Sequence, residues 1–222
     1  MRSPVRAGEW KTDKLYYERW YSSRDWTFYS HLLGQIVVHS CPGPILDLGA
    51  GTGLLVECAT RWGLDCQGLD GSHDAVAIGL QRFPALRISQ HHLSKPLPLP
   101  NGSVQTVLLN QVIEHLEPEV AKHTLSECFR VLRTRGLVFV LSPSRFNRYE
   151  RKTDPTHINM YAPSELRELI HNTGFVDIAS MDAPIDFRGK GGIVPRAAMW
   201  FLFRATNWDF LSSTANCRAY KP

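Results

Sequence analysis

The sequence lacks the features that mark several large classes of protein. Its five cysteines are odd in number, include no Cys-x-x-Cys pair and follow no segment that resembles a secretory signal. We therefore expect free thiols in a reducing cytoplasm and no disulfide framework. The longest apolar run near the C-terminus, residues 197–203, is far too short to span a membrane. The sequence also has no internal repeats, no low-complexity tracts and no linker that would divide it into two domains.

The chain also has only a small excess of positive over negative charge. Lys and Arg number 25 against 21 Asp and Glu, and the resulting formal net charge of +4 is spread along 222 residues. A nucleic-acid-binding protein more often gathers its positive charge into a stripe, so we expect no nucleic acid partner. Apolar residues make up 43% of the chain, which is typical of a globular protein and too high for a disordered one.

From residue 44 onward, short apolar segments alternate with longer segments of helical character. Strands are predicted over residues 44–49, 66–70, 86–89, 104–110, 137–142 and 175–181, with a last strand within 212–221. Helices are predicted over residues 54–62, 73–83, 118–133 and 163–174. Strands that alternate with helices of this length predict a parallel sheet that is covered on both faces.

The two ends of the chain are less regular. Residues 10–29 hold eight aromatic side chains, and Tyr16, Tyr17 and Trp20 have helical spacing. These three rings could line a pocket under a helical lid, although most aromatic residues of this segment are expected to pack a helix on the sheet. Residues 187–210 mix Arg and Lys with apolar residues. They could contact an anionic acceptor, a partner subunit or a membrane surface, and we favour an insertion packed beside the last strands.

The most informative segment is Asp-Leu-Gly-Ala-Gly-Thr-Gly, residues 47–53, which joins the first predicted strand to the first helix. Glycines at alternate positions allow a tight turn and the close approach of a ligand. Their G-x-G-x-G spacing differs from the dinucleotide fingerprint, and Asp47 favours a cationic ligand over a pyrophosphate. Asp70 ends the second strand, where a carboxylate can accept both hydroxyls of a ribose. The alternative is that Asp70 caps the next helix.

At this point the sequence resembles the class I S-adenosylmethionine-dependent methyltransferases. The resemblance covers about residues 41–182. Five segments carry it in family order: ILDLGAGTG (45–53), GLDGS (68–72), PLPLPNGSVQTVLLNQVIEHL (96–116), RVLRTRGLVFVLSPS (130–144) and THINMYAPSELRELIHNTGF (156–175). The last of them is common in members that act on small molecules and sugars.

The resemblance implies an α/β fold. This fold is a three-layer Rossmann-like sandwich whose mostly parallel, seven-stranded sheet has an antiparallel last strand and an N-terminal helical cap. It also implies a single methyltransferase domain over residues 1–222. Within it, residues 1–40 would form the aromatic helical cap, residues 41–182 the cofactor-binding core, and residues 183–222 a C-terminal insertion and the last strand. In such a fold the shared core binds the cofactor, and the two flanks would select the acceptor.

The implied cofactor is S-adenosyl-L-methionine, with S-adenosyl-L-homocysteine as product. By resemblance, the glycine loop faces the methionine part of the cofactor, Asp70 holds the ribose, and Asn110 lies near the amino end. His92 stands where the family usually has an Asp that reads the adenine, and a neutral imidazole can accept the same hydrogen bond. The residues predicted to bind the cofactor are Asp47, Gly49, Ala50, Gly51, Asp70, Gly71, His92, Leu93 and Asn110.

Methyl transfer from a sulfonium requires an aligned nucleophile, the exclusion of water and, for some acceptors, removal of a proton. His115 follows the fourth predicted strand, and His157 follows the fifth, with Asp154 three residues earlier as an orienting group. We favour His157 as the base and His115 as a residue that shapes the site. The alternative for both is a loop histidine that only forms hydrogen bonds. No group of residues has the spacing of metal ligands, so no metal site is predicted.

The predicted function is methyl transfer to an oxygen or nitrogen of a small molecule, such as a natural product, a sugar or a similar metabolite. A protein or nucleic acid acceptor is disfavoured, because residues 110–113 read Asn-Gln-Val-Ile where enzymes of that kind usually have Asn/Asp-Pro-Pro-aromatic. A non-catalytic protein that binds the cofactor or a partner is the alternative from another class. A nicotinamide oxidoreductase is disfavoured by the glycine spacing. The sequence leaves open whether two copies form a homodimer.

Overall fold

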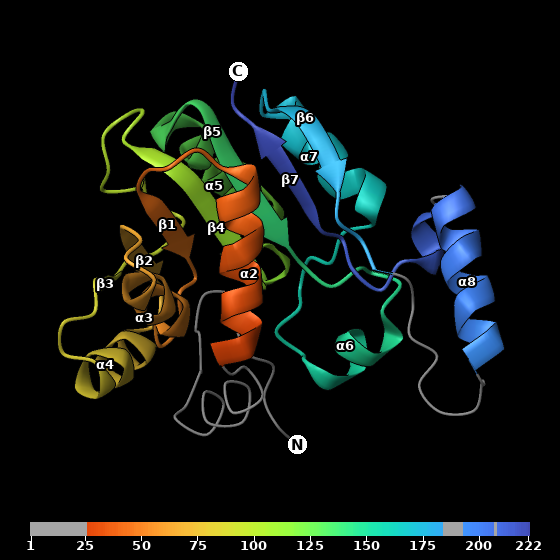
Figure 1. Ribbon diagram of the computed structural model, residues 1–222, viewed down its shortest axis with the longest axis horizontal. Coiled ribbons are helices and arrows are strands. Elements are labelled where there is room, and N and C mark those ends of the chain that lie inside the picture. The colour runs from red at the N-terminus through yellow and green to blue at the C-terminus, as the bar shows by residue number, and fades with distance from the viewer. Residues whose placement is uncertain (1–25, 184–192, 207) are drawn as a thin grey trace.

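A computed structural model describes residues 26–183, 193–206 and 208–222, and a twisted sheet lies at its centre (Figure 1). The strands are β1 (Ile45–Leu48), β2 (Cys66–Asp70), β3 (Ile88–Gln90), β4 (Val104–Asn110), β5 (Leu132–Leu141), β6 (Val176–Ser180) and β7 (Cys217–Tyr220). The helices are α2 (Trp26–His39), α3 (Leu54–Arg61), α4 (His73–Arg82), α5 (Pro118–Val131), α6 (Arg148–Thr153), α7 (Pro163–Asn172) and α8 (Ile193–Thr206), with short 3-10 turns η1 (Ile113–His115) and η2 (Asp209–Leu211).

The seven strands follow the order β3-β2-β1-β4-β5-β7-β6. β1 pairs in parallel with β2 and β4, and the parallel pairing extends outward to β3 and β5. β7 runs antiparallel to both of its neighbours, β5 and β6. This arrangement confirms the predicted Rossmann-like sheet with an antiparallel last strand. Because β1 to β5 are parallel, their carboxyl ends meet at one edge, which is where open α/β sheets bind ligands.

Alternate residues of the central strands build the two apolar layers that flank the sheet. Val107 and Leu109 of β4 pack with α5 and α7, whereas Leu108 between them packs with α2, α3 and α4. This alternation is the expected consequence of side chains that point to opposite faces along a strand. In Figure 1, α2 lies in front of the sheet and α5 behind it. The carboxyl edge of the sheet is thereby held rigidly from both sides.

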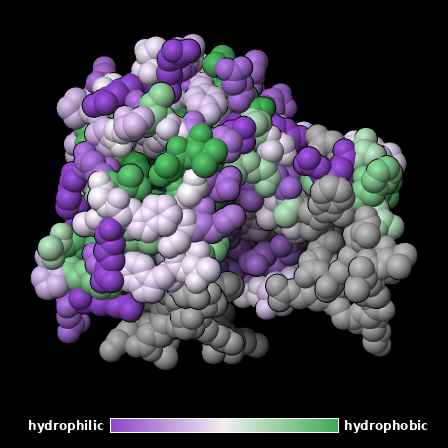
Figure 2. All heavy atoms as spheres, in the orientation of Figure 1, coloured by the Kyte–Doolittle hydropathy of each residue, from purple (hydrophilic) through white to green (hydrophobic). Residues whose placement is uncertain are grey.

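The N-terminal helix α2 belongs to one of these layers. Its buried side chains are Tyr29, Leu32, Leu33 and Ile36. Figure 2 shows hydrophobic surface at the C-terminal end of this helix, where Val37 and Val38 are exposed. The ring of Tyr29 packs the helix on the sheet, whereas Trp26 and Phe28, the other described aromatic residues of this segment, are exposed.

Several predicted boundaries differ from the structure. β5 begins at Leu132 rather than at residue 137, because Leu132 pairs with Val104 before an irregularity that contains Arg135 at φ 60°. The last strand occupies only Cys217–Tyr220 of the predicted 212–221, since only these residues pair along β5. Residues 86–89 were predicted as the third strand, which instead spans Ile88–Gln90. Helices α6 and α8 were not predicted.

All five cysteines lie among the described residues, and all are free thiols, as the sequence predicts. Cys41 is exposed, whereas the other four are buried. Burial raises the pKa of the Cys217 thiol to about 12, so this side chain behaves as a small apolar group. Among the residues that the structure describes, no helix combines the length and the apolar character needed to cross a membrane.

Two helical glycines give a matched test of the packing. A Cβ at Gly79 in α4 would lie 2.6 Å from the Thr52 carbonyl oxygen, whereas a Cβ at Gly34 in α2 would meet no atom within 4 Å. We expect Gly34→Ala to raise the free energy of unfolding by about 0.5–1 kcal/mol. Gly79→Ala should instead lower it by about 1–3 kcal/mol, because the loop must shift to admit the methyl group. Urea denaturation measures both changes, and a gain for Gly79→Ala would contradict the packing described.

Candidate functional site

The loop between β1 and α3 turns on left-handed glycines. Gly49, Gly51 and Gly53 have φ angles of 71°, 56° and 73°, a region that residues with a Cβ rarely adopt. A Cβ at Gly49 would also lie 2.3 Å from a methyl carbon of Val112. The glycine loop therefore packs directly against the segment that follows β4.

The Asp70 carboxylate joins this loop to the turn after β2. Its Oδ2 accepts the Gly51 N–H at 2.7 Å, and its Oδ1 accepts the Ser72 N–H at 2.8 Å. Each oxygen retains acceptor capacity for a further donor, such as a ribose hydroxyl. Burial raises the pKa of the Asp70 carboxyl, and the two backbone N–H groups of Ser72 and Gly51 oppose that shift. The side chain that caps α4 is that of Ser72, which accepts the Ala75 N–H, so Asp70 is not the N-cap.

The other residues predicted to bind the cofactor lie along the same edge. The His92 ring lies over Gly71, with Nδ1 3.5 Å from the position that a Cβ of Gly71 would occupy. Leu93 packs against the core, and its carbonyl oxygen accepts the Thr124 hydroxyl at 3.4 Å. Asp47 is buried in β1, and Asn110 ends β4. The structure thus brings the predicted set to the carboxyl ends of four adjacent strands, β3, β2, β1 and β4.

The chain turns sharply after β4. Gln111 has a φ of 59°, which is unusual for a residue with a side chain, and its N–H donates to the Leu141 carbonyl at 2.7 Å. The turn η1 follows at once and carries Glu114 and His115. Strained backbone of this kind persists where the surrounding structure enforces it, and it is common at functional sites.

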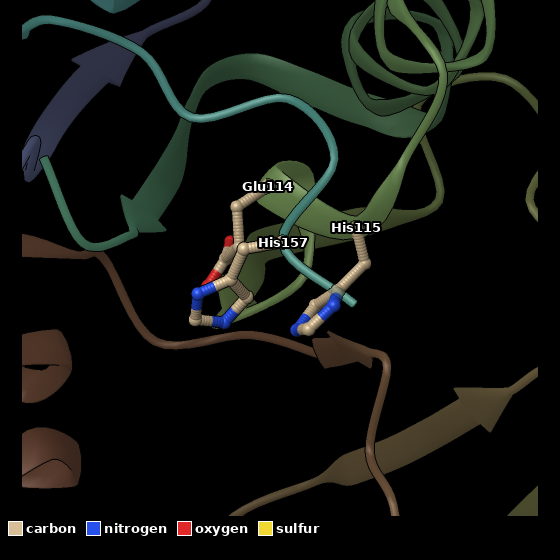
Figure 3. Close-up of side chains that lie close together, drawn as sticks. All are labelled: Glu114, His115 and His157. Atoms are coloured by element: carbon tan, nitrogen blue, oxygen red, sulfur yellow. The ribbon is translucent and has the colours of Figure 1, made fainter. Parts of the chain in front are cut away.

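Glu114, His115 and His157 form a compact cluster beside this turn (Figure 3). One potential ligand atom from each side chain lies within 4.8 Å of the others, and the centroids of the two imidazole rings are 4.7 Å apart. Glu114 is fully buried. The Asn159 N–H donates to the Glu114 carbonyl at 2.9 Å, which fixes the loop that carries His157 against η1.

Asp154 organises both imidazoles of this cluster. Its Oδ1 accepts the N–H of Thr156 at 2.9 Å and also the hydroxyl of the same residue. The Thr156 hydroxyl and carbonyl oxygens lie 3.0 and 3.1 Å from Nδ1 of His115. The other carboxylate oxygen of Asp154 lies 3.6 Å from Nε2 of His157. Asp154 therefore orients His157 directly and His115 through Thr156.

The electrostatics of the cluster favour a charged Asp154 beside a neutral His157. Burial lowers the pKa of His157, and this effect outweighs the opposing influence of Asp154 and Glu150. Burial acts to raise the pKa of Asp154, but the hydrogen bonds from Thr156 and the nearby imidazoles of His157 and His115 outweigh it. The pKa of Asp154 consequently lies below its usual value.

The sequence predicted part of this cluster. It selected His115, His157 and Asp154, which the structure brings together, but it gave no role to Glu114 or Thr156. Two features of the sequence could have indicated these residues. Glu114 directly precedes His115, and Thr156 lies between Asp154 and His157. The residues proposed as a lid, Tyr16, Tyr17 and Trp20, lie outside the described residues, as does part of the segment 187–210.

The sheet order, the glycine loop after β1 and the acidic residue at the end of β2 together define the class I, Rossmann-like methyltransferase fold. Solved structures of this class cover nearly the whole chain. A methyltransferase from Archaeoglobus fulgidus aligns with a TM-score of 0.69 at 20% identity, over 93% of this chain and 98% of its own. A chain from the complex of the Haloferax volcanii Trm112 activator with a methyltransferase aligns with a TM-score of 0.67, also at 20% identity, over 93% and 96% of the two chains.

Sequence comparison finds similar proteins over part of the chain. Residues 46–140 match the family model described as a methyltransferase domain. A protein of Mycolicibacterium smegmatis that is named a "probable S-adenosylmethionine-dependent methyltransferase" is 36% identical over 149 residues, which are 64% of this chain and 55% of that protein. A Mycobacterium tuberculosis protein with the same description is 35% identical over 141 residues, which are 61% of this chain and 49% of that protein.

Residues 46–140 therefore belong to a methyltransferase domain, whose cofactor is S-adenosylmethionine. The alignments span about half the length of these curated relatives. The matched region includes β1 and β4, with the glycine loop and Asp70 between them.

Replacing Asp70 tests the cofactor site. Asp70→Asn is expected to weaken S-adenosylmethionine binding about tenfold or more, because the amide keeps one acceptor oxygen and directs an NH₂ group at a backbone N–H. Isothermal titration calorimetry measures the change. Asp65→Asn is the matched control, since the exposed Asp65 pairs with Arg87 and lies before β2, away from the glycine loop. Equal affinity of the two variants would contradict the assignment of Asp70.

Proposed function

We propose that this protein transfers the methyl group of S-adenosylmethionine to an oxygen or nitrogen of a small-molecule acceptor, such as a natural product, a sugar or a similar metabolite. The observation that carries the proposal is the contact between Gly49 and Val112. Gly49 belongs to the cofactor loop, and Val112 immediately precedes the turn that holds Glu114 and His115. An acceptor bound at this cluster would therefore lie beside the methionine end of the cofactor.

The reaction is an in-line displacement at the methyl carbon. A lone pair of the acceptor oxygen or nitrogen forms the new bond to carbon, the carbon–sulfur bond breaks, and its electron pair returns to sulfur as S-adenosylhomocysteine leaves. The enzyme contributes alignment of the two reactants and exclusion of water. A neutral acceptor group such as a hydroxyl must also lose its proton.

His157 is the proposed proton acceptor. Its Nε2 faces the Asp154 carboxylate, so the neutral ring holds its lone pair on Nδ1, an atom that is buried without a hydrogen-bond partner among the described residues. Burial keeps the imidazole neutral near pH 7, and the Asp154 carboxylate would stabilise the imidazolium that forms. His115 is proposed to shape the acceptor site beside it, with its ring fixed by Thr156.

The segments that flank the core are proposed to determine which acceptor binds. Residues 1–40 and 183–222 lie outside the core that the motifs define, and the match to the family model ends well inside both limits. The whole of residues 1–222 would then act as one methyltransferase domain. The free thiols support a cytoplasmic location for the protein.

A metabolite panel with methyl-labelled cofactor tests the function. We expect label in a small molecule, and we expect His157→Ala to lower kcat by about 10²–10⁴-fold, the usual contribution of a general base. The affinity for S-adenosylmethionine should remain within about twofold, because His157 lies on the acceptor side of the loop. His171→Ala is the control, since this exposed histidine lies on α7.

Two results would contradict the proposal. Unchanged turnover in His157→Ala would exclude the imidazole as the base. Label that appears in protein or nucleic acid, and in no metabolite, would exclude a small-molecule acceptor.

A further inference from the structure

We propose that Glu114, His115 and His157 bind a divalent transition-metal ion. Two imidazole nitrogens and one carboxylate oxygen are a common ligand set for such ions. The side chains converge from two parts of the chain, the turn η1 and the loop after α6 (Figure 3). Sequence spacing predicted no metal site, because His157 is far from the Glu114-His115 pair along the chain.

The three side chains lie near enough to share one ion after a modest rearrangement. The three ligand atoms lie within 4.8 Å of one another. Three ligands at about 2.0–2.2 Å from one ion lie about 3.3–3.8 Å apart. Rotation of the side chains by about an ångström would therefore close the site. The hydrogen bond from Asn159 to the Glu114 carbonyl, 2.9 Å long, already holds the two contributing segments together.

A hydrogen bond of His115 and the charged neighbour of His157 favour the tautomers that a metal requires. Nδ1 of His115 lies 3.1 Å from the Thr156 carbonyl, which can only accept, so Nδ1 carries the proton and Nε2 presents the lone pair. Nε2 of His157 faces Asp154, which leaves the lone pair on Nδ1. The side chain of His157 is only 4% exposed, and its Nδ1 has no hydrogen-bond partner among the described residues.

One carboxylate thus orients both proposed histidine ligands. Asp154 acts on His157 directly and on His115 through Thr156. Metal-binding histidines almost always donate their second N–H to a carboxylate, a carbonyl or water, and such partners fix the ring and raise its basicity.

The ligand set favours particular ions. Imidazole nitrogen suits Zn²⁺, Fe²⁺ and Co²⁺, and a carboxylate extends the range to Mn²⁺, whereas Mg²⁺ and Ca²⁺ prefer oxygen ligands. The buried Asp154 carboxylate beside the cluster would also stabilise an ion of charge +2. Three protein ligands leave further coordination positions open.

An open position suggests what the ion does, and this step rests on the proposed function. A hydroxyl oxygen of the acceptor could coordinate there, and the ion would lower the pKa of that hydroxyl so that its proton leaves to water. In the metal-loaded protein the lone pair of His157 binds the ion. The imidazole then cannot also accept the proton of the acceptor hydroxyl. The acceptor atom would then be oxygen. Binding of the ion itself does not depend on methyl transfer.

Cobalt titration tests the site directly. Protein without a histidine tag, freed of metal by a chelator, is titrated with Co²⁺ and followed by visible absorption and calorimetry. We expect one saturable site that Zn²⁺ displaces and Mg²⁺ does not. Glu114→Gln and His157→Ala should weaken binding by more than tenfold. Thr156→Val, which removes only the orienting hydroxyl, should weaken it by about 10- to 100-fold. His73→Ala is the control, because this exposed histidine beside Asp74 is remote from the cluster in sequence and in the fold.

The outcomes separate this proposal from the proposed function. Protein that binds S-adenosylmethionine but no Co²⁺ overturns the metal site and leaves the function untouched. Stoichiometric Co²⁺ binding that survives in both Glu114→Gln and His157→Ala, with both variants shown by urea denaturation to be folded, also overturns it. Co²⁺ binding that these variants lose supports the site even if no acceptor is ever methylated.

Discussion

The double hydrogen bond that the Asp70 carboxylate accepts is the interaction on which the cofactor site depends. One bond reaches Gly51 in the loop after β1, and the other reaches Ser72 in the turn after β2. These two segments are otherwise independent turns at the edge of the sheet. Because Gly51 has a left-handed backbone, its N–H can point at the carboxylate while the chain still enters α3. The same carboxylate then faces the position proposed for the ribose.

The strand order extends this arrangement to the acceptor side. β1 lies between β2 and β4, so the glycine loop has Asp70 on one side and the turn after β4 on the other. Gly49 and Val112 lie so close together that no room remains for a Cβ at position 49. β5 follows β4 in the sheet, and the chain beyond it returns with Asp154 and His157 to the turn that carries Glu114. The proposed cofactor and acceptor sites therefore lie on adjacent halves of one sheet edge.

The sequence predicted the central strands well and the peripheral ones less well. Residues 66–70 and 104–110 form strands with the predicted bounds, because both are short segments flanked by polar and turn residues. The bounds of β5 and β7 depend on which residues pair with a neighbouring strand. The pairing of Val104 with Leu132 cannot be recognised from the residues around either position in the sequence. Asp70 could be chosen from its place after a strand. The cluster of Glu114 with His157 could not, because tertiary contacts of two loops create it.

A crystal structure of the protein with S-adenosylhomocysteine would test the arrangement of the two sites most directly. We expect both ribose hydroxyls to donate to the Asp70 carboxylate, and the sulfur to lie above the glycine loop and face the cluster of Glu114, His115 and His157. A cofactor bound elsewhere, or one whose sulfur faces away from that cluster, would contradict it.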